Sequence, residues 1–154
     1  MNKNGITLIE TLLVIGVLVI LAATGAGIYR NYSKNVELES NVSAIISDLK
    51  SVQSKAMSGE DGLKWGIRFV NPPAGASDYY EVFSTPTDYS DLSKIVKRTA
   101  YLSDMISFSE PAEGFNKDII FNKIRGTVDA QKQVVLTFEE TNKTITVTTI
   151  GTIY

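Results

Sequence analysis

Two side chains, Ser47 and Lys50, have the Ser-x-x-Lys spacing in which serine acyl-enzymes hold a nucleophile and its base. The companion motifs of those enzymes are missing from the chain, and the pair lies in a segment with helical periodicity, so a solvated helix face explains it better. The 154 residues include no His and no Cys, which excludes imidazole bases, thiol nucleophiles, thiolate zinc sites and disulfides. We therefore predict that the protein is not an enzyme and has no catalytic residue and no cofactor.

Acidic residues in two places raise the question of a calcium site. Asp88 and Asp91 lie close together in the sequence, and Glu60 and Asp61 form another acidic pair. No EF-hand spacing is present, however, and roles in turns or helix caps account for these residues. We predict no metal site.

Binding to nucleic acid has weak support. The nearest approach to a basic cluster is Lys94, Lys97 and Arg98 on a predicted strand, where such charges commonly serve solvation and edge protection. The charges of Lys and Arg against Asp and Glu give 15 − 17 = −2, so no uniform basic field attracts DNA. The terminal segment from Thr144 to Tyr154 has no basic residue. We predict no nucleic-acid partner.

The position of Glu10 is the feature that most needs a physical reason, because it is the only charged residue between Ile6 and Ile28. At about 1.5 Å per residue, a helix of that length covers the roughly 30 Å of a hydrocarbon layer. A carboxylate inside such a layer costs about 2.5–3.5 kcal/mol, which favours a functional role. Three alternatives stay open: a signal peptide cleaved near Ala26, a simple membrane anchor, and a capping box in which Glu10 reaches back to Thr7.

The N-terminal stretch resembles the leader and processing junction of bacterial type IV pilins and type II secretion pseudopilins in residues Lys3 to Glu10, which read KNGITLIE. The resemblance implies that prepilin peptidase cuts after Gly5 and N-methylates the new terminus at Ile6. It also implies that Glu10 attracts the terminal amine of a neighbouring subunit during assembly. That amine has an unperturbed pKa near 8 and is mostly cationic at neutral pH. A buried carboxylate is strongly unfavourable without such a partner, so the pair can select the register of assembly.

A helical period continues beyond the apolar run. Apolar residues recur at spacings of three and four and define one stripe: Leu38, Val42, Ile45, Ile46, Leu49, Val52 and Ala56. The sequence SGEDG at 58–62 then stops the pattern. We predict one helix from about Ile6 to about Met57, apolar on all sides in its first half and amphipathic in its second.

From Lys64 onward the period changes to two, which is typical of half-buried antiparallel strands. Strands are predicted at 64–69, 79–84, 95–102, 105–109, 118–122, 134–139 and 144–148. The closing stretches, Ile119 to Val128 and Ile145 to Ile153, are similar to the end of GspH/FimT-like minor pilins and pseudopilins.

These patterns predict an α+β, pilin-like fold. A long N-terminal α-helix, transmembrane and then amphipathic, is expected to pack on a C-terminal antiparallel β-sheet domain. The predicted divisions are a prepilin leader at 1–5, a transmembrane or filament-core helix at 6–28, an amphipathic stalk at 29–58 and a β-rich globular domain at 59–154.

The resemblance implies a structural subunit of a type IV pilus or type II secretion pseudopilus, inserted in the membrane as a prepilin and assembled through its N-terminal helix. Implied partners are prepilin peptidase, other pilin or pseudopilin subunits, the inner-membrane assembly platform and lipid around 6–28. The expected location is the inner membrane, single-pass with an extracytoplasmic C-terminal domain, and then the filament. The alternative is a membrane-anchored extracytoplasmic binding or adhesin domain that does not polymerise; only the filament hypothesis makes Glu10 indispensable.

Overall fold

The computed structural model describes residues 7–154, apart from the side chains of residues 25–28, 30 and 31. The predicted processing junction, Gly5 and Ile6, lies outside the described residues. The chain divides into two compact units, Met1–Val36 and Glu37–Tyr154.

Helix α1 extends over Leu8–Ser58 and contributes to both units. At its start, the Thr7 hydroxyl accepts a hydrogen bond from the Glu10 backbone N–H at 3.3 Å, which is the contact of an N-cap residue. At its end, Gly59 has a left-handed φ of 69°, and its N–H donates to the Ala56 carbonyl. Glycine adopts this conformation without a steric penalty, so the SGEDG sequence ends the helix where the pattern predicted.

The predicted transmembrane part of this helix is corrected by the structure. Among the described residues, no helical stretch is both long and apolar enough to cross a membrane. The described apolar run at the start of α1, residues 8–24, has 17 residues, whereas a span takes about 20. The predicted fold class is therefore wrong in its transmembrane helix at 6–28, and the predicted location as a single-pass inner-membrane protein is wrong with it.

Seven antiparallel strands form two sheets in the second unit. The first sheet has the order β3-β2-β1-β5 and contains β1 (Lys64–Val70), β2 (Tyr79–Thr85), β3 (Ile95–Tyr101) and β5 (Asn116–Phe121). The second has the order β4-β6-β7 and contains β4 (Ser107–Glu110), β6 (Lys132–Phe138) and β7 (Thr141–Val147). Each strand lies within a few residues of a predicted one, but the division into two sheets was not predicted.

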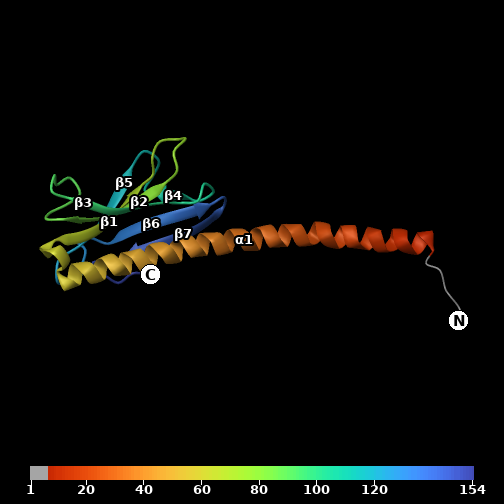
Figure 1. Cartoon of the computed structure of the whole chain (residues 1–154), viewed down its shortest axis with the longest axis horizontal. Coiled ribbons are helices and arrows are strands. Elements are labelled where there is room, and N and C mark those ends of the chain that lie inside the picture. The colour runs from red at the N-terminus through yellow and green to blue at the C-terminus, as the bar shows by residue number, and fades with distance from the viewer. Residues whose placement is uncertain (1–6) are drawn as a thin grey trace. The chain divides into compact units, whose positions relative to one another are not determined.

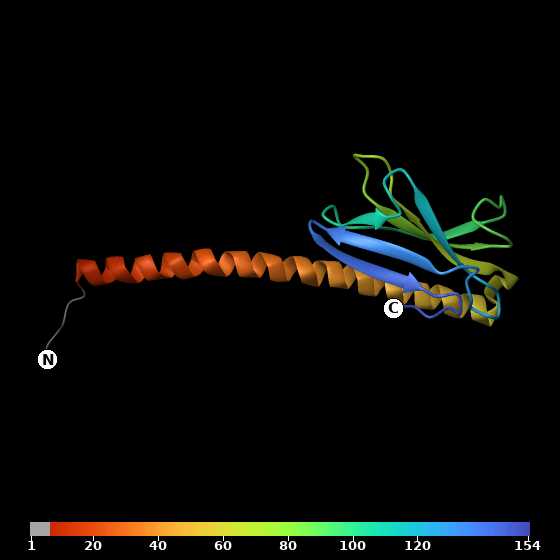
Figure 2. The ribbon, with the colours of Figure 1, turned by 180° about the vertical axis from the view of Figure 1, so that it is seen from behind.

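One hydrophobic core joins the second half of α1 to both sheets (Figure 1). The helix contributes the predicted stripe, of which Leu38, Ile45 and Leu49 are almost completely buried. Large side chains of the sheets complete the core, including Trp65, Phe69, Phe121, Leu136 and Ile145. Seen from behind, the same half of α1 runs along the strands β6 and β7 (Figure 2). The amphipathic half of the helix is thus held by burial of its apolar stripe.

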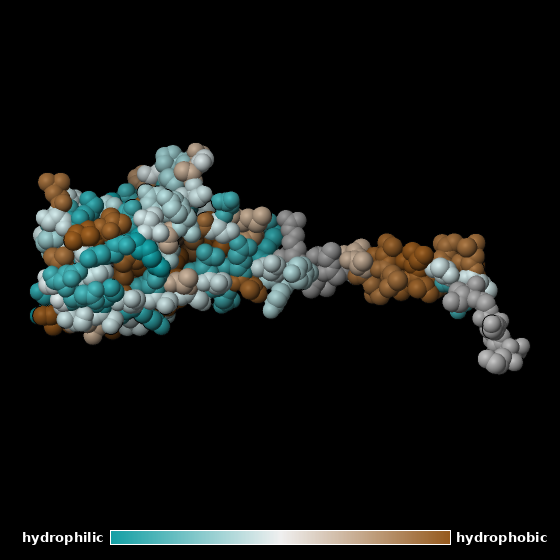
Figure 3. Space-filling model, in the orientation of Figure 1, coloured by the Kyte–Doolittle hydropathy of each residue, from teal (hydrophilic) through white to brown (hydrophobic). Residues whose placement is uncertain are grey.

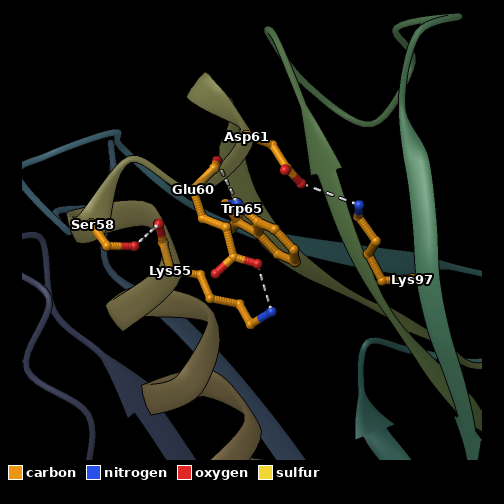
Figure 4. A network of polar contacts seen from close by, with 6 residues as sticks. All are labelled: Lys55, Ser58, Glu60, Asp61, Trp65 and Lys97. Atoms are coloured by element: carbon orange, nitrogen blue, oxygen red, sulfur yellow. Dashed lines mark hydrogen bonds and ion pairs between the residues drawn. The ribbon is translucent and has the colours of Figure 1, made fainter.

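A polar network fixes the end of α1 to the first sheet (Figure 4). The short helix η1 (Glu60–Gly62) follows the turn. The Trp65 indole N–H donates to the Glu60 carbonyl at 3.1 Å, and Lys55 pairs with the Glu60 carboxylate at 3.0 Å. Lys97 of β3 pairs with Asp61 at 3.2 Å. The Lys55 ammonium also lies 4.3 Å from the centre of the Trp65 ring, a cation–π contact.

Candidate assembly surface

The first half of α1 exposes large apolar side chains, and Figure 3 shows them on one face of the helix. Between Leu8 and Leu21 they range from 48% exposed at Val17 to 83% exposed at Leu8. A helix that is apolar all round is normally buried, and contiguous apolar surface of this kind marks an interaction site. Within the first unit the described residues do not cover this surface. It is the strongest candidate for a functional surface in the chain.

Glu10 is the single charged side chain on the described part of this surface. Its backbone N–H is used by the Thr7 cap, whereas its carboxylate receives no hydrogen bond or ion pair from any residue that the structure describes. A capping box requires a second bond, from the Thr7 N–H to the Glu10 carboxylate, and the described contacts contain only the first. The cap therefore explains why the helix begins at this position, but it leaves the carboxylate available to a partner.

The apolar surroundings of Glu10 determine what that partner must be. Leu13 and Val14 lie three and four residues beyond Glu10, on the same face of the helix, and both are exposed, so they would flank the carboxylate once another molecule covered this part of the helix. An ion buried without a partner is strongly unfavourable, commonly by about 3–5 kcal/mol. A cationic group on the covering molecule removes this penalty. The surface is therefore apolar in bulk but selective for a cation at one point.

The Ser-x-x-Lys pair forms no catalytic arrangement. Ser47 and Lys50 are both exposed on α1, whereas Asp48 between them is engaged with the first sheet. The Asp48 carboxylate accepts a hydrogen bond from the Tyr80 hydroxyl at 2.6 Å and pairs with Arg98 of β3. Burial, followed by this hydrogen bond, raises the pKa of Tyr80. This part of the helix is therefore a docking face for the sheet.

The acidic residues considered for calcium are used locally. Asp88 accepts a hydrogen bond from the Ser90 N–H and Asp91 accepts one from the Ser93 N–H, each at 2.8 Å. The hydrogen bonds from Ser90 and Ser93 lower the pKa values of these two carboxyl groups. Glu60 and Asp61 are paired with lysines in the network at the end of α1. In residues 7–154, no group of three acidic side chains has a geometry that could hold a metal ion.

The three basic residues considered for nucleic acid are also engaged within the domain. The Lys94 ammonium lies 4.7 Å from the centre of the Tyr89 ring, Lys97 pairs with Asp61, and Arg98 pairs with Asp48. Carboxylates therefore compensate the charges of Lys97 and Arg98, whereas Lys94 has a contact with an aromatic ring.

Sequence reasoning missed one structural contact that organises the C-terminal segment. The Gln53 side chain of α1 donates to the carbonyl oxygens of Gly126 and Gly151, at 2.9 and 2.8 Å. The two glycines were visible as turn residues, with φ values of 63° and 88°. Nothing in the helical pattern distinguished Gln53 from its solvated neighbours, because the contact depends on residues 73 and 98 positions away.

Comparison with known protein families, with characterised proteins and with solved structures finds no match to this chain. The resemblance to type IV pilins stays a prediction carried by residues Lys3 to Glu10. The similarity of the closing stretches to GspH/FimT-like proteins stays a prediction as well.

Proposed function

We propose that the chain is a structural subunit of a type IV pilus or type II secretion pseudopilus, which polymerises through the first half of α1. One observation carries the proposal: the Glu10 carboxylate, which has no ion pair with any described residue, lies within an exposed apolar helix surface. An adhesin domain that never polymerises has no use for a single acid at this place. The pilin-like N-terminal motif, which includes Glu10, supports the same proposal.

Assembly follows from the chemistry of the helix surface. When the first halves of α1 from several subunits pack together, the apolar side chains between Leu8 and Leu21 leave water. The Glu10 carboxylate enters the same bundle and requires a cation. Prepilin peptidase would supply one by cutting after Gly5, because the freed amine of Ile6 is mostly protonated at neutral pH. The two ions offset each other's desolvation cost, and registers that leave Glu10 unpaired are disfavoured.

Substitution of Glu10 by Gln tests the proposal most simply. Glu10→Gln keeps the size and removes the charge, and we expect it to prevent incorporation into filaments in cells that carry the assembly machinery. Glu39→Gln is the matched control on the same helix, because Glu39 is exposed and has only a long ion pair with Lys143, at 3.7 Å. We expect that control to assemble normally. Equal incorporation of both variants would refute the proposal and favour a binding domain that does not polymerise.

A further inference from the structure

Strand β6 has a partly uncovered edge in the second sheet. Strand β4 ends where Glu110 is paired with Val135 of β6. Strand β6 itself begins at Lys132. Within the described residues, the stretch 132–134 has β7 on one side and no strand on the other.

A groove with a volume of about 640 Å³ lies at this uncovered edge. It is lined by Glu110, Lys117, Gln131, Lys132, Gln133 and Val135. Lys117 comes from β5, which is the edge strand of the first sheet, so edge strands of both sheets border the groove. Its walls are therefore mostly polar side chains and strand backbone.

Backbone groups of Gln133 point into this groove. Its carbonyl oxygen accepts a hydrogen bond from the Lys117 ammonium at 3.0 Å instead of one from a strand. Gln133 is opposite Thr146 of β7, and the Thr146 N–H donates to the Tyr154 carbonyl, away from β6. Gln133 and Thr146 therefore form a pair without mutual hydrogen bonds, and the Gln133 N–H points to the groove like its carbonyl.

We propose that the groove receives an extended peptide segment of a partner protein, which adds to β6 in line with β4. An extended chain presents N–H and C=O groups at the spacing that the free edge requires. The peptide would bond to Gln133 and displace the Lys117 ammonium from its carbonyl. Lys117 is paired with Glu110 across the groove, whereas Lys132 has no ion pair among the described residues, so the charge of Lys132 favours a peptide with an acidic side chain. This inference does not depend on the proposed role of Glu10.

Strand β3 forms an edge of the first sheet, and it is a poorer site for strand addition than β6. Its pairing with β2 shifts register between Val82 and Phe83, which leaves Lys97 as an extra residue in β3. Such bulges and charges on an edge strand oppose pairing with another chain. Residues 95–101 therefore serve as an internal control for the site on β6.

The test uses the full chain and an acetylated, amidated hexapeptide that alternates valine with glutamate. Peptide is titrated to millimolar concentration while backbone resonances are followed by NMR. We expect saturable shifts at Gln133 and Lys117 and slower hydrogen exchange of the Gln133 amide. The same peptide with lysine in place of glutamate should bind about tenfold more weakly, and a backbone N-methylated version should not bind. Absence of saturable shifts at Gln133, or shifts confined to residues 95–101, would overturn the proposal.

Two variants make the result specific to the edge of β6. Gln133→Pro removes the N–H that points to the groove and leaves the β6–β7 ladder intact, so we expect loss of binding by a folded protein. Lys132→Glu reverses a charge at the rim of the groove. This variant should bind the lysine peptide more tightly than the glutamate peptide. Unchanged affinity in both variants would contradict the proposed site.

Discussion

The contact between Gln53 and the C-terminal segment predicts a large loss of stability for Gly151→Ala. Gly151 has a φ of 88°, and an added Cβ would overlap the Gly126 carbonyl oxygen and the Gln53 amide nitrogen. The Gln53 side chain would have to move, which breaks its hydrogen bonds to both carbonyl oxygens. The substitution therefore combines backbone strain with the loss of two partly buried hydrogen bonds.

The magnitude follows from these two terms. A left-handed conformation costs a residue with a Cβ about 1–2 kcal/mol. Two lost hydrogen bonds cost about 0.5–1.5 kcal/mol each, or about 1–3 kcal/mol together. We therefore expect Gly151→Ala to lower the free energy of unfolding by about 2–5 kcal/mol.

Gly75→Ala is the matched control for this experiment. Gly75 has a φ of 103°, but a Cβ there would meet nothing within 4 Å, so only the strain term applies. Urea unfolding of the full chain can be followed by fluorescence of Trp65, the only Trp of the sequence, which is 1% exposed. We expect Gly151→Ala to be less stable than Gly75→Ala by about 1–3 kcal/mol. Equal losses in the two variants would refute the view that Gln53 fixes the C-terminal segment.

Three further measurements test other features of the chain. Ser84→Ala should leave the thermal unfolding temperature unchanged or raise it, because the Ser84 hydroxyl is buried without a hydrogen-bond partner in the described part of the chain; a clear drop would reveal a partner. The free energy of unfolding should fall as pH rises above 10.0, because the pKa of Tyr80 is raised from that value and the fold retains a proton that the unfolded chain releases. In Tyr80→Phe this part of the decline should be absent when the free energy of unfolding is measured by urea unfolding, followed by circular dichroism, at several pH values. A pH profile identical to that of the unsubstituted protein would contradict the assignment of the decline to Tyr80. Mass spectrometry of filament-associated protein should give a chain that begins at a methylated Ile6, whereas an intact leader through Gly5 would contradict the proposed processing.

The sequence pattern predicted the local elements of the second unit well because burial follows the period of each element. The stripe from Leu38 to Ala56 faces the core, and the alternating segments became strands. The sequence did not indicate whether the strands form one sheet or two. Alternation of apolar and polar residues indicates which face of a strand is buried, but it does not indicate which strands pair. Pairing depends on contacts such as Trp65 with Ser84 of β2 and Phe121 of β5, which are distant in sequence.

The candidate surface was only partly predictable. The isolated position of Glu10 in an apolar run indicated its importance directly, and the Thr7 cap is visible as a threonine three residues before a glutamate. The groove beside Gln133 gave no such signal. The groove exists because β4 does not extend alongside the first residues of β6. How far one strand extends along another is a property of the assembled sheet. The transmembrane interpretation is wrong because, among the residues that the structure describes, no helical stretch is both long and apolar enough to cross a membrane.

The most direct measurement is the surroundings of Glu10 in an assembled filament, obtained by cryo-electron microscopy of filaments that contain this subunit. We predict that the first halves of α1 form the centre of the filament and that each Glu10 carboxylate lies within about 4 Å of a cationic group of a neighbouring subunit. A filament in which Glu10 faces solvent, or in which the bundle surrounds it without a cation, would contradict the proposed role of this residue in assembly.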